Sequence, residues 1–255
     1  MDPLTELSLF SGYGGISLGL GLVLPIRPVG YVEIEPYCQQ ILQSRIRDGV
    51  LDDAPIWDDI TTFDGKPWRG SVDIISGGFP CQDISCAGKG AGIADGTRSG
   101  LWFEMLRVIR EIRPRYVLAE NVGALLRRGM GIVQEGLAEA GYDTRWTSIR
   151  ASDVGAPFRG ERVFIAAWPR NSQRINGVCT KPVLGEHIFS WCEGIRVPED
   201  LRGRPDIPEP LICRKNDGAT RNVVESDIAG NGVVPQQVAQ AVVELFGIQP
   251  TWKGI

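Results

Sequence analysis

The chain has few of the residues that build metal or disulfide sites. Its 255 residues include a single histidine, His187, and six cysteines, none of which forms a Cys-x-x-Cys pair. Structural zinc sites are made of several cysteine and histidine ligands, so we expect no metal here. Thiols without a disulfide or metal pattern are typical of a reducing compartment, and a cytoplasmic location is expected.

Long apolar runs are also lacking. No segment approaches the roughly 20 consecutive apolar residues of a membrane-spanning helix. The first residues, Met1 to Glu6, are acidic, so we expect no signal peptide. With 43% hydrophobic and 23% charged residues, the composition is typical of a globular protein without a membrane partner. The length suffices for one large domain, or for a domain with a small insert.

Positive charge is scarce overall and unevenly distributed. The formal net charge is −4, and residues 1–100 contain 7 Lys and Arg against 13 Asp and Glu. Residues 101–255 contain 20 against 18. This small excess weakly favours a nucleic-acid contact formed by the second half, although total charge alone does not identify a binding surface.

Short apolar strands alternate with helices along most of the chain. The helix expected at 101–113 has apolar residues at 101, 105, 108, 109 and 112 and stops before Pro114. Alternation with short glycine-rich links predicts an α/β fold with a mostly parallel, doubly wound sheet. Strands are expected at 7–10, 29–33, 72–76, 116–119, 142–149 and 162–168, and further helices at 15–23, 37–47, 132–140 and 234–246.

This periodicity is absent from residues 169–227, which contain six prolines and scattered arginines. Such a stretch indicates either a small irregular domain or a long insert. We therefore divide the chain into a core at 1–168, an irregular region at 169–227 and a C-terminal segment at 228–255. The helix of that last segment is expected to return to the core.

A cysteine follows the strand at 72–76, on a loop that two glycines and a proline make tight and stiff: Gly77-Gly78-Phe79-Pro80-Cys81. Strand ends of α/β domains open into the ligand crevice, so Cys81 suits a nucleophile. Taken alone, the loop is equally compatible with Cys81 as a small packing residue.

Glu120 follows the strand at 116–119 in an otherwise apolar segment. Burial would raise its pKa and let it donate a proton or a hydrogen bond near neutral pH. A thiol and a carboxyl on neighbouring strand ends suit addition to an electron-poor ring. The thiolate attacks a ring carbon, and the acid serves the ring nitrogen that gains charge.

A glycine loop, Phe10-Ser11-Gly12-Tyr13-Gly14-Gly15, lies between the first strand and helix. It allows a ligand to approach the backbone and a helix N-terminus, but it lacks the spacing of the common nucleotide-binding fingerprints, and a tight turn remains an alternative. About 20 residues later, Glu33 suits the hydroxyls of a ribose, or is a solvated acid. Asp59, before Ile60, suits an adenine amino group and is equally ambiguous.

Together, these segments resemble the DNA (cytosine-5)-methyltransferase family. The resemblance covers roughly residues 5–168 and 228–246, and about 40 residues separate Cys81 from Glu120. Because the motifs occur in the family's order, the whole set is far more specific than any one of them. The matching segments are Phe10–Gly15, Gly78–Gln82, Glu120–Val122, Glu161–Arg162 and Gly230–Val234.

The resemblance implies a Rossmann-like S-adenosylmethionine-dependent methyltransferase fold, with a small irregular target-recognition insert at 169–227. It implies a monomer that methylates carbon 5 of cytosine in double-stranded DNA, with S-adenosyl-L-methionine as cofactor. Cys81 would attack carbon 6, Glu120 would engage ring nitrogen 3, and Arg162 would help hold the flipped base. The residues expected at the cofactor are Phe10, Ser11, Gly12, Gly14, Gly15, Glu33, Ile34, Asp59, Ile60, Pro80, Leu101 and Asn231.

The chain departs from the family pattern at two places. Phe158 and Gly160 stand where the family has the glutamine and the first arginine of Gln-x-Arg-x-Arg, and Leu211–Gly218 replaces a helix rich in arginine and leucine. Two other functions therefore stay open: methylation of transfer RNA, as in the RNA-directed branch of the family, and DNA binding without catalysis. The biological role is open between restriction-modification, evasion of restriction and regulation.

Overall fold

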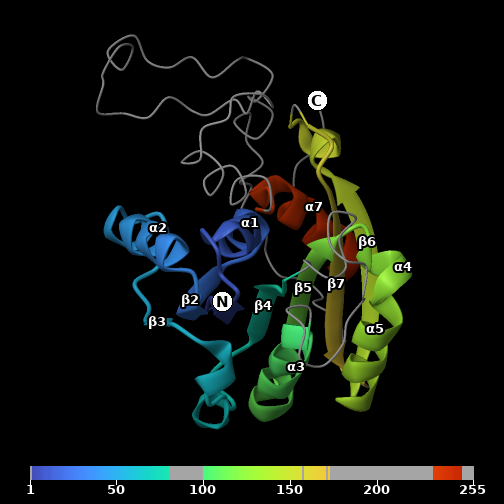
Figure 1. Cartoon of the computed structure of the whole chain (residues 1–255), viewed down its shortest axis with the longest axis horizontal. Coiled ribbons are helices and arrows are strands. Elements are labelled where there is room, and N and C mark those ends of the chain that lie inside the picture. Colours follow the sequence, from blue (N-terminus) through green and yellow to red (C-terminus); the bar gives the residue numbers. More distant parts are fainter. Residues whose placement is uncertain (1, 81–99, 157, 171, 173–231, 249–255) are drawn as a thin grey trace.

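The computed structural model describes residues 2–80, 100–156, 158–170, 172 and 232–248. They form one seven-stranded sheet in the order β3-β2-β1-β4-β5-β7-β6, with helices on both faces (Figure 1). The strands are β1 (Leu4–Leu9), β2 (Ile26–Val32), β3 (Ile56–Trp57), β4 (Ile74–Gly78), β5 (Tyr116–Val122), β6 (Tyr142–Arg150) and β7 (Glu161–Pro169).

The helices lie in two layers. One face is covered by α1 (Gly15–Val23), α2 (Pro36–Arg47) and the C-terminal α7 (Pro235–Phe246). The other face is covered by α3 (Leu101–Ile112), α4 (Leu125–Arg128) and α5 (Met130–Glu139). One apolar core, around Trp102 and Leu137, lies beneath α3 and α5, and a second, around Leu20 and Val242, lies beneath α1 and α7. The predicted α/β class is confirmed.

The strand directions also follow the prediction of a mostly parallel sheet. Among the described strands, only β7 runs opposite to all the others, and it pairs antiparallel with β5 and β6. β5 is longer than the predicted strand at 116–119, because β7 pairs with it as far as Val122. Glu120 therefore lies within the strand, two residues before its end, and not in a following loop.

The predicted C-terminal helix returns to the core as α7 and packs against α1 (Figure 1). The two helices meet at Gly19, where a Cβ atom would lie 2.4 Å from both the carbonyl oxygen of Pro235 and the Cβ of Val238. Only glycine allows this approach, because no side-chain atom fits that distance.

Most of the irregular region at 169–227 lies outside the described residues, so the three-part division of the chain stays a prediction. In the described part of the chain, no helix is long and apolar enough to cross a membrane. Among the same residues, no group of three or more His, Cys, Asp or Glu side chains could hold a metal ion.

Candidate functional site

Two of the candidate catalytic residues, Glu120 and Arg162, meet at the edge of the sheet where the parallel strands end. Gly78, at the end of β4, pairs with Glu120 in β5, and Val122 pairs with Arg162 in β7. Because β7 is antiparallel, its first residues lie at the same edge as the last residues of β4 and β5. The topology thus brings together two side chains that are 42 positions apart in the sequence.

Glu120 and Arg162 form a buried ion pair. Nε of Arg162 lies 3.1 Å from Oε1 of Glu120, and both residues are 8% exposed. Burial raises the pKa of Glu120 to about 7, against the opposing effect of the Arg162 charge. The carboxyl can therefore both hold and release a proton near neutral pH.

The backbone of β4 leaves room for this carboxyl. A Cβ atom on Gly78 would lie 2.6 Å from Oε2 of Glu120, so any larger residue would push the carboxylate away. Gly78 belongs to the predicted Gly-Phe-Pro-Cys-Gln segment, and the glycine is needed there for close approach to the acid.

The loop that leads to Cys81 begins beside the same pair. The Phe79 ring packs against Trp102 with ring centres 5.2 Å apart, and Pro80 is half-buried. The side-chain amide of Asn121 donates to the Phe79 carbonyl. Cys81 itself lies outside the described residues, so its role as nucleophile stays a prediction.

The glycine loop after β1 is bound to the end of β2. Phe10, Gly12 and Gly14 have φ angles of 51°, 54° and 83°, in the left-handed region that glycine tolerates best. Ser11 N–H donates to the Val32 carbonyl at 3.1 Å. The loop therefore turns sharply and begins α1 at Gly15.

Glu33, directly after β2, holds this loop. Its carboxylate accepts from the N–H of Gly12 at 2.6 Å and from the N–H of Glu35 at 2.8 Å. Glu33 is 8% exposed, so the alternative of a solvated acid is wrong. Burial raises its pKa, and the backbone hydrogen bonds partly oppose that shift.

The other predicted cofactor residues lie around the same strand ends. Ile34 is apolar and 66% exposed, next to the buried Glu33. Asp59 begins a 3-10 turn, η1 (Ile60–Thr62), and its Oδ1 accepts from Thr61 N–H at 2.8 Å. The Ile60 side chain is buried in the core beneath α3, and the half-buried Leu101, which begins that helix, packs against the same core.

The C-terminal segment approaches the glycine loop. The Tyr13 hydroxyl donates to the Val233 carbonyl, and a Cβ atom on Gly15 would lie 2.9 Å from that same oxygen. Arg45 lies over the Tyr13 ring at 5.0 Å and donates to the Tyr13 carbonyl at 2.6 Å. Asn231 lies outside the described residues. Gly232 and Val233, directly after it, lie beside Tyr13 of the glycine loop.

Neither Tyr13, Arg45 nor Asn121 was singled out from the sequence. Their contacts join residues 32, 42 and 220 positions apart. No periodicity or local motif carries such long-range information. The only available signal was that Tyr13 and Asn121 lie inside the predicted motifs.

The order of these site residues matches a known family. Residues 4–190 match the sequence model of the C-5 cytosine-specific DNA methylase family. The chain belongs to this family. The predicted resemblance is confirmed, and the sheet described above is the methylase fold.

Several named methylases are similar to the chain. The type II methyltransferase M.CviJI of Paramecium bursaria Chlorella virus IL3A is 28% identical over 250 residues, which are 97% of this chain and 61% of that protein. M2.BsuMI of Bacillus subtilis is 36% identical over 214 residues, which are 74% of this chain and 52% of that protein. The chain thus spans little more than half the length of these relatives.

Solved structures agree with the fold. An Escherichia coli prophage protein described as a DNA modification methyltransferase is 26% identical with a TM-score of 0.53, covering 66% of this chain and 47% of its own. The Dnmt2 methyltransferase of Schizosaccharomyces pombe is 22% identical with a TM-score of 0.53, covering 67% of this chain and 51% of its own. The second likeness concerns the fold alone.

The departure from the methylase pattern before β7 has a structural reason. Gly160 has a φ of +26°, and a Cβ atom there would lie 2.9 Å from the ring of the half-exposed Phe158. The Gly160 carbonyl accepts from Nε2 of the buried Gln237 at 2.8 Å. Phe158 and Gly160 are therefore a matched pair, because the family's arginine at position 160 would require the ring to move.

Proposed function

We propose that this methylase transfers a methyl group from S-adenosylmethionine to carbon 5 of cytosine in double-stranded DNA, through a covalent bond between Cys81 and carbon 6. The observation that carries the proposal is the buried Glu120 carboxyl, 3.1 Å from Arg162, at the strand ends where the loop to Cys81 begins. A buried acid with a pKa of about 7 suits protonation of a ring nitrogen.

The chemistry of the residues at the ends of β1, β2 and β3 fits the cofactor. The Glu33 carboxylate suits two ribose hydroxyls, Asp59 suits an amino group, and the exposed Ile34 offers an apolar contact. A Cβ atom on Gly12 would meet nothing within 4 Å, so the loop leaves open space at that point. When bound, S-adenosylmethionine supplies a methyl group attached to a positively charged sulfur.

In the proposed reaction, bond formation at carbon 6 and carbon 5 of the base is coupled to proton transfer at nitrogen 3. The Cys81 thiolate forms a bond to carbon 6 of the base, and the Glu120 carboxyl gives its proton to nitrogen 3. Carbon 5 gains electron density and takes the methyl group. The bond between that methyl and the cofactor sulfur would break, and its electron pair would stay on the sulfur, which loses its positive charge. Carbon 5 then loses its proton to a base, the bond from carbon 6 to sulfur breaks, and nitrogen 3 returns its proton to Glu120. Arg162 orients the Glu120 carboxylate throughout.

The target base lies inside the DNA stack and must first be extruded, at a cost of a few kcal/mol. Residues 169–227 are the proposed target-recognition region, and such regions contact base edges in the major groove. Its arginines, such as Arg202 and Arg204, are proposed to set DNA affinity and not the rate of methyl transfer.

A duplex that carries 5-fluorocytosine tests the proposed covalent step. Fluorine at carbon 5 blocks the loss of the proton, so the protein should stay attached to the DNA under denaturing conditions when cofactor is present. The Cys81→Ala variant should form no adduct. The Cys86→Ala variant is the matched control and should form it normally. An adduct that persists in Cys81→Ala would overturn the assignment.

Acceptor competition distinguishes the alternatives. Labelled methyl should enter duplex DNA and not transfer RNA, and bisulfite sequencing of the DNA should locate it on cytosines. Labelling of transfer RNA alone would support the RNA-directed branch of the family. DNA binding without any labelling would identify a catalytically silent relative.

A further inference from the structure

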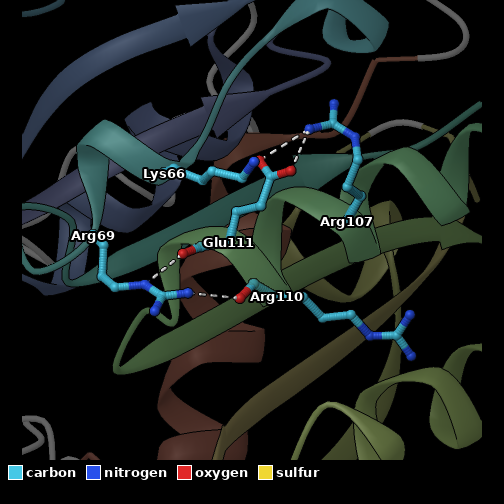
Figure 2. Close-up of a pocket in the computed structure, with 5 residues that line it drawn as sticks. All are labelled: Lys66, Arg69, Arg107, Arg110 and Glu111. Atoms are coloured by element: carbon cyan, nitrogen blue, oxygen red, sulfur yellow. Dashed lines mark hydrogen bonds and ion pairs between the residues drawn. The ribbon is translucent and has the colours of Figure 1, made fainter.

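A basic pocket lies away from the strand ends, between α3 and the 3-10 turn η2 (Lys66–Trp68). It has a volume of about 510 Å³ and is lined by Lys66, Arg69, Arg107, Arg110 and Glu111 (Figure 2). Four cations around a single carboxylate would suit an added anion. However, the Glu111 carboxylate already lies among them and is hydrogen-bonded to Arg107, while the Arg110 guanidinium points away from it (Figure 2).

The side chains that line the pocket instead bind residues 60–69 to α3. The guanidinium of Arg107 donates from Nη2 to the Ile60 carbonyl at 2.7 Å and from Nη1 to the Phe63 carbonyl at 2.9 Å. On its own helix it pairs with Glu104 at 2.8 Å and with Glu111 at 3.0 Å. Two carboxylates thus fix the guanidinium in the orientation that holds both carbonyls.

Glu111 adds a second point of attachment. Its Oε2 accepts from the Gly65 N–H at 2.8 Å, and a Cβ atom on Gly65 would lie 2.9 Å from that oxygen. Arg69 adds a third, because it donates to the main-chain carbonyls of Glu111 at 2.8 Å and Arg110 at 3.3 Å (Figure 2). Residues 60–69 are therefore bound to α3 at four positions, Ile60, Phe63, Gly65 and Arg69.

This segment begins at the proposed adenine contact. Asp59 is the N-cap of η1, and Ile60, whose carbonyl Arg107 holds, is the first residue of that turn. The preceding strand, β3, contains only two residues, so the sheet gives Asp59 little support. Helix α3 itself begins at Leu101, which is another proposed cofactor residue. One helix thus positions two walls of the proposed site.

We propose that Arg107 and Glu111 are positioning residues for the cofactor, which hold Asp59 and Ile60 in place through the 60–65 segment without contacting the cofactor themselves. This inference rests on the proposed function, because it takes Asp59 as the adenine contact and Ile60 as a residue at the cofactor. It adds that cofactor affinity depends on a guanidinium that lies one helical turn and a half beyond Leu101.

The test compares Arg107→Met with Arg110→Met. Methionine keeps the apolar stem of arginine and removes every donor. Arg110 lies one turn away, and among the described residues its guanidinium pairs only with the exposed carboxylate of Glu139. Arg107→Met should weaken S-adenosylmethionine binding on the order of tenfold, as expected for lost charge-assisted hydrogen bonds. Arg110→Met should bind like the unaltered chain.

Kinetics separate positioning from general damage. KM for the cofactor should rise with its Kd in Arg107→Met, whereas kcat at saturating cofactor should stay within about twofold, because the catalytic pair is untouched. Hydrogen exchange of the Gly65 amide should become faster in Arg107→Met and stay unchanged in Arg110→Met. Glu111→Gln keeps an oxygen for Gly65 but loses the ion pair, and it should give a smaller rise in Kd. Glu111→Gln provides the test of the positioning role if Arg107→Met does not fold.

Two outcomes would overturn the inference, and they are distinguishable. If Asp59→Ala weakens cofactor binding while Arg107→Met and Glu111→Gln leave it unchanged, the positioning role is wrong and the proposed site stands. If Asp59→Ala also leaves binding unchanged, the proposed placement of the cofactor is wrong, and the positioning role fails with it.

Discussion

The side-chain amide of Asn121 donates a hydrogen bond of 3.0 Å to the backbone carbonyl of Phe79. Asn121 is 2% exposed, and its Oδ1 accepts from the Val122 N–H at 2.8 Å. Asn121, which follows the proposed acid Glu120, thus binds the loop two positions before the proposed nucleophile Cys81. A single buried amide links the two halves of the proposed chemistry.

Removal of this amide should slow the formation of the covalent bond. Asn121→Ala leaves the Phe79 carbonyl without its donor, a loss of about 1–3 kcal/mol for a buried group, or roughly 5- to 150-fold in rate if the loop moves. Single-turnover adduct formation on 5-fluorocytosine DNA would measure it. Cofactor Kd should be unchanged. Thr147→Val, which removes an exposed hydrogen bond to Glu244, is the control and should keep its rate.

Glu120→Gln should reduce turnover sharply, because an amide cannot give a proton to nitrogen 3. General acid catalysis contributes roughly 10²- to 10⁴-fold. With a pKa of about 7, the acid is progressively ionised above neutrality, so the rate of the unaltered chain should fall along that limb. The variant should lack this dependence. DNA affinity should change far less, and a loss of affinity at an unchanged rate would contradict the assignment.

Glu33→Ala should weaken S-adenosylmethionine binding by about 1.5–3 kcal/mol, the range of charge-assisted hydrogen bonds. Because the carboxylate also holds the N–H groups of Gly12 and Glu35, the free energy of unfolding should fall as well. Calorimetry and urea unfolding would measure the two effects. Glu35→Ala, which removes an exposed carboxylate two residues away, should keep the affinity. Equal affinities in all three proteins would refute the ribose contact.

Glu6 lies in the middle of β1 with no exposed surface, and its Oε1 accepts from the hydroxyls of Ser17 in α1 and Ser76 in β4. Burial raises its pKa from 4.5 to about 7, against the effect of the two hydroxyl hydrogen bonds. Below pH 4.5 the carboxyl is neutral in the folded and unfolded chains alike. Between pH 4.5 and 7 mainly the unfolded chain ionises, so this group lowers stability as the pH rises.

The Glu6→Gln variant isolates that contribution, because it cannot ionise. The shift corresponds to about 3 kcal/mol. The stability of Glu6→Gln relative to the unaltered chain should therefore increase by about that amount between pH 4.5 and 8. Urea unfolding at several pH values would measure it, and the ionisation of Glu120 cancels in the difference. A difference that does not vary with pH would show that Glu6 titrates normally.

The sequence allowed the elements to be predicted well because each has a local signal. The helix predicted at 101–113 is α3, which ends at Ile112 with Arg113 in the left-handed region, directly before Pro114. The predicted end of the strand at residue 119 was wrong, because pairing with β7 extends β5 to Val122 and that contact is not local. Helix α4, four residues long, was not predicted, since one turn is too short to show a periodicity.

The site was predictable as a set of motifs but not as a set of contacts. Glu33 on its own was compatible with solvent, and its burial follows from the way the glycine loop folds back onto β2. Arg107 and Glu111 form an ordinary i, i+4 pair in the sequence. Their hydrogen bonds to Ile60, Phe63 and Gly65 span more than 40 positions, so only the folded chain reveals them.

The direction of β7 limits how the proposed target-recognition region can be exchanged. β7 begins at the edge with Arg162 and ends at Pro169, opposite Tyr142, at the far edge of the sheet. The described chain resumes at Gly232, which is back beside Tyr13 at the first edge. Arg162 and Pro169 are seven residues apart along the strand, which is about 23 Å at roughly 3.3 Å per residue. A module that replaces the proposed target-recognition region would therefore have to span that distance between its junctions, so modules with adjacent ends would need added linkers.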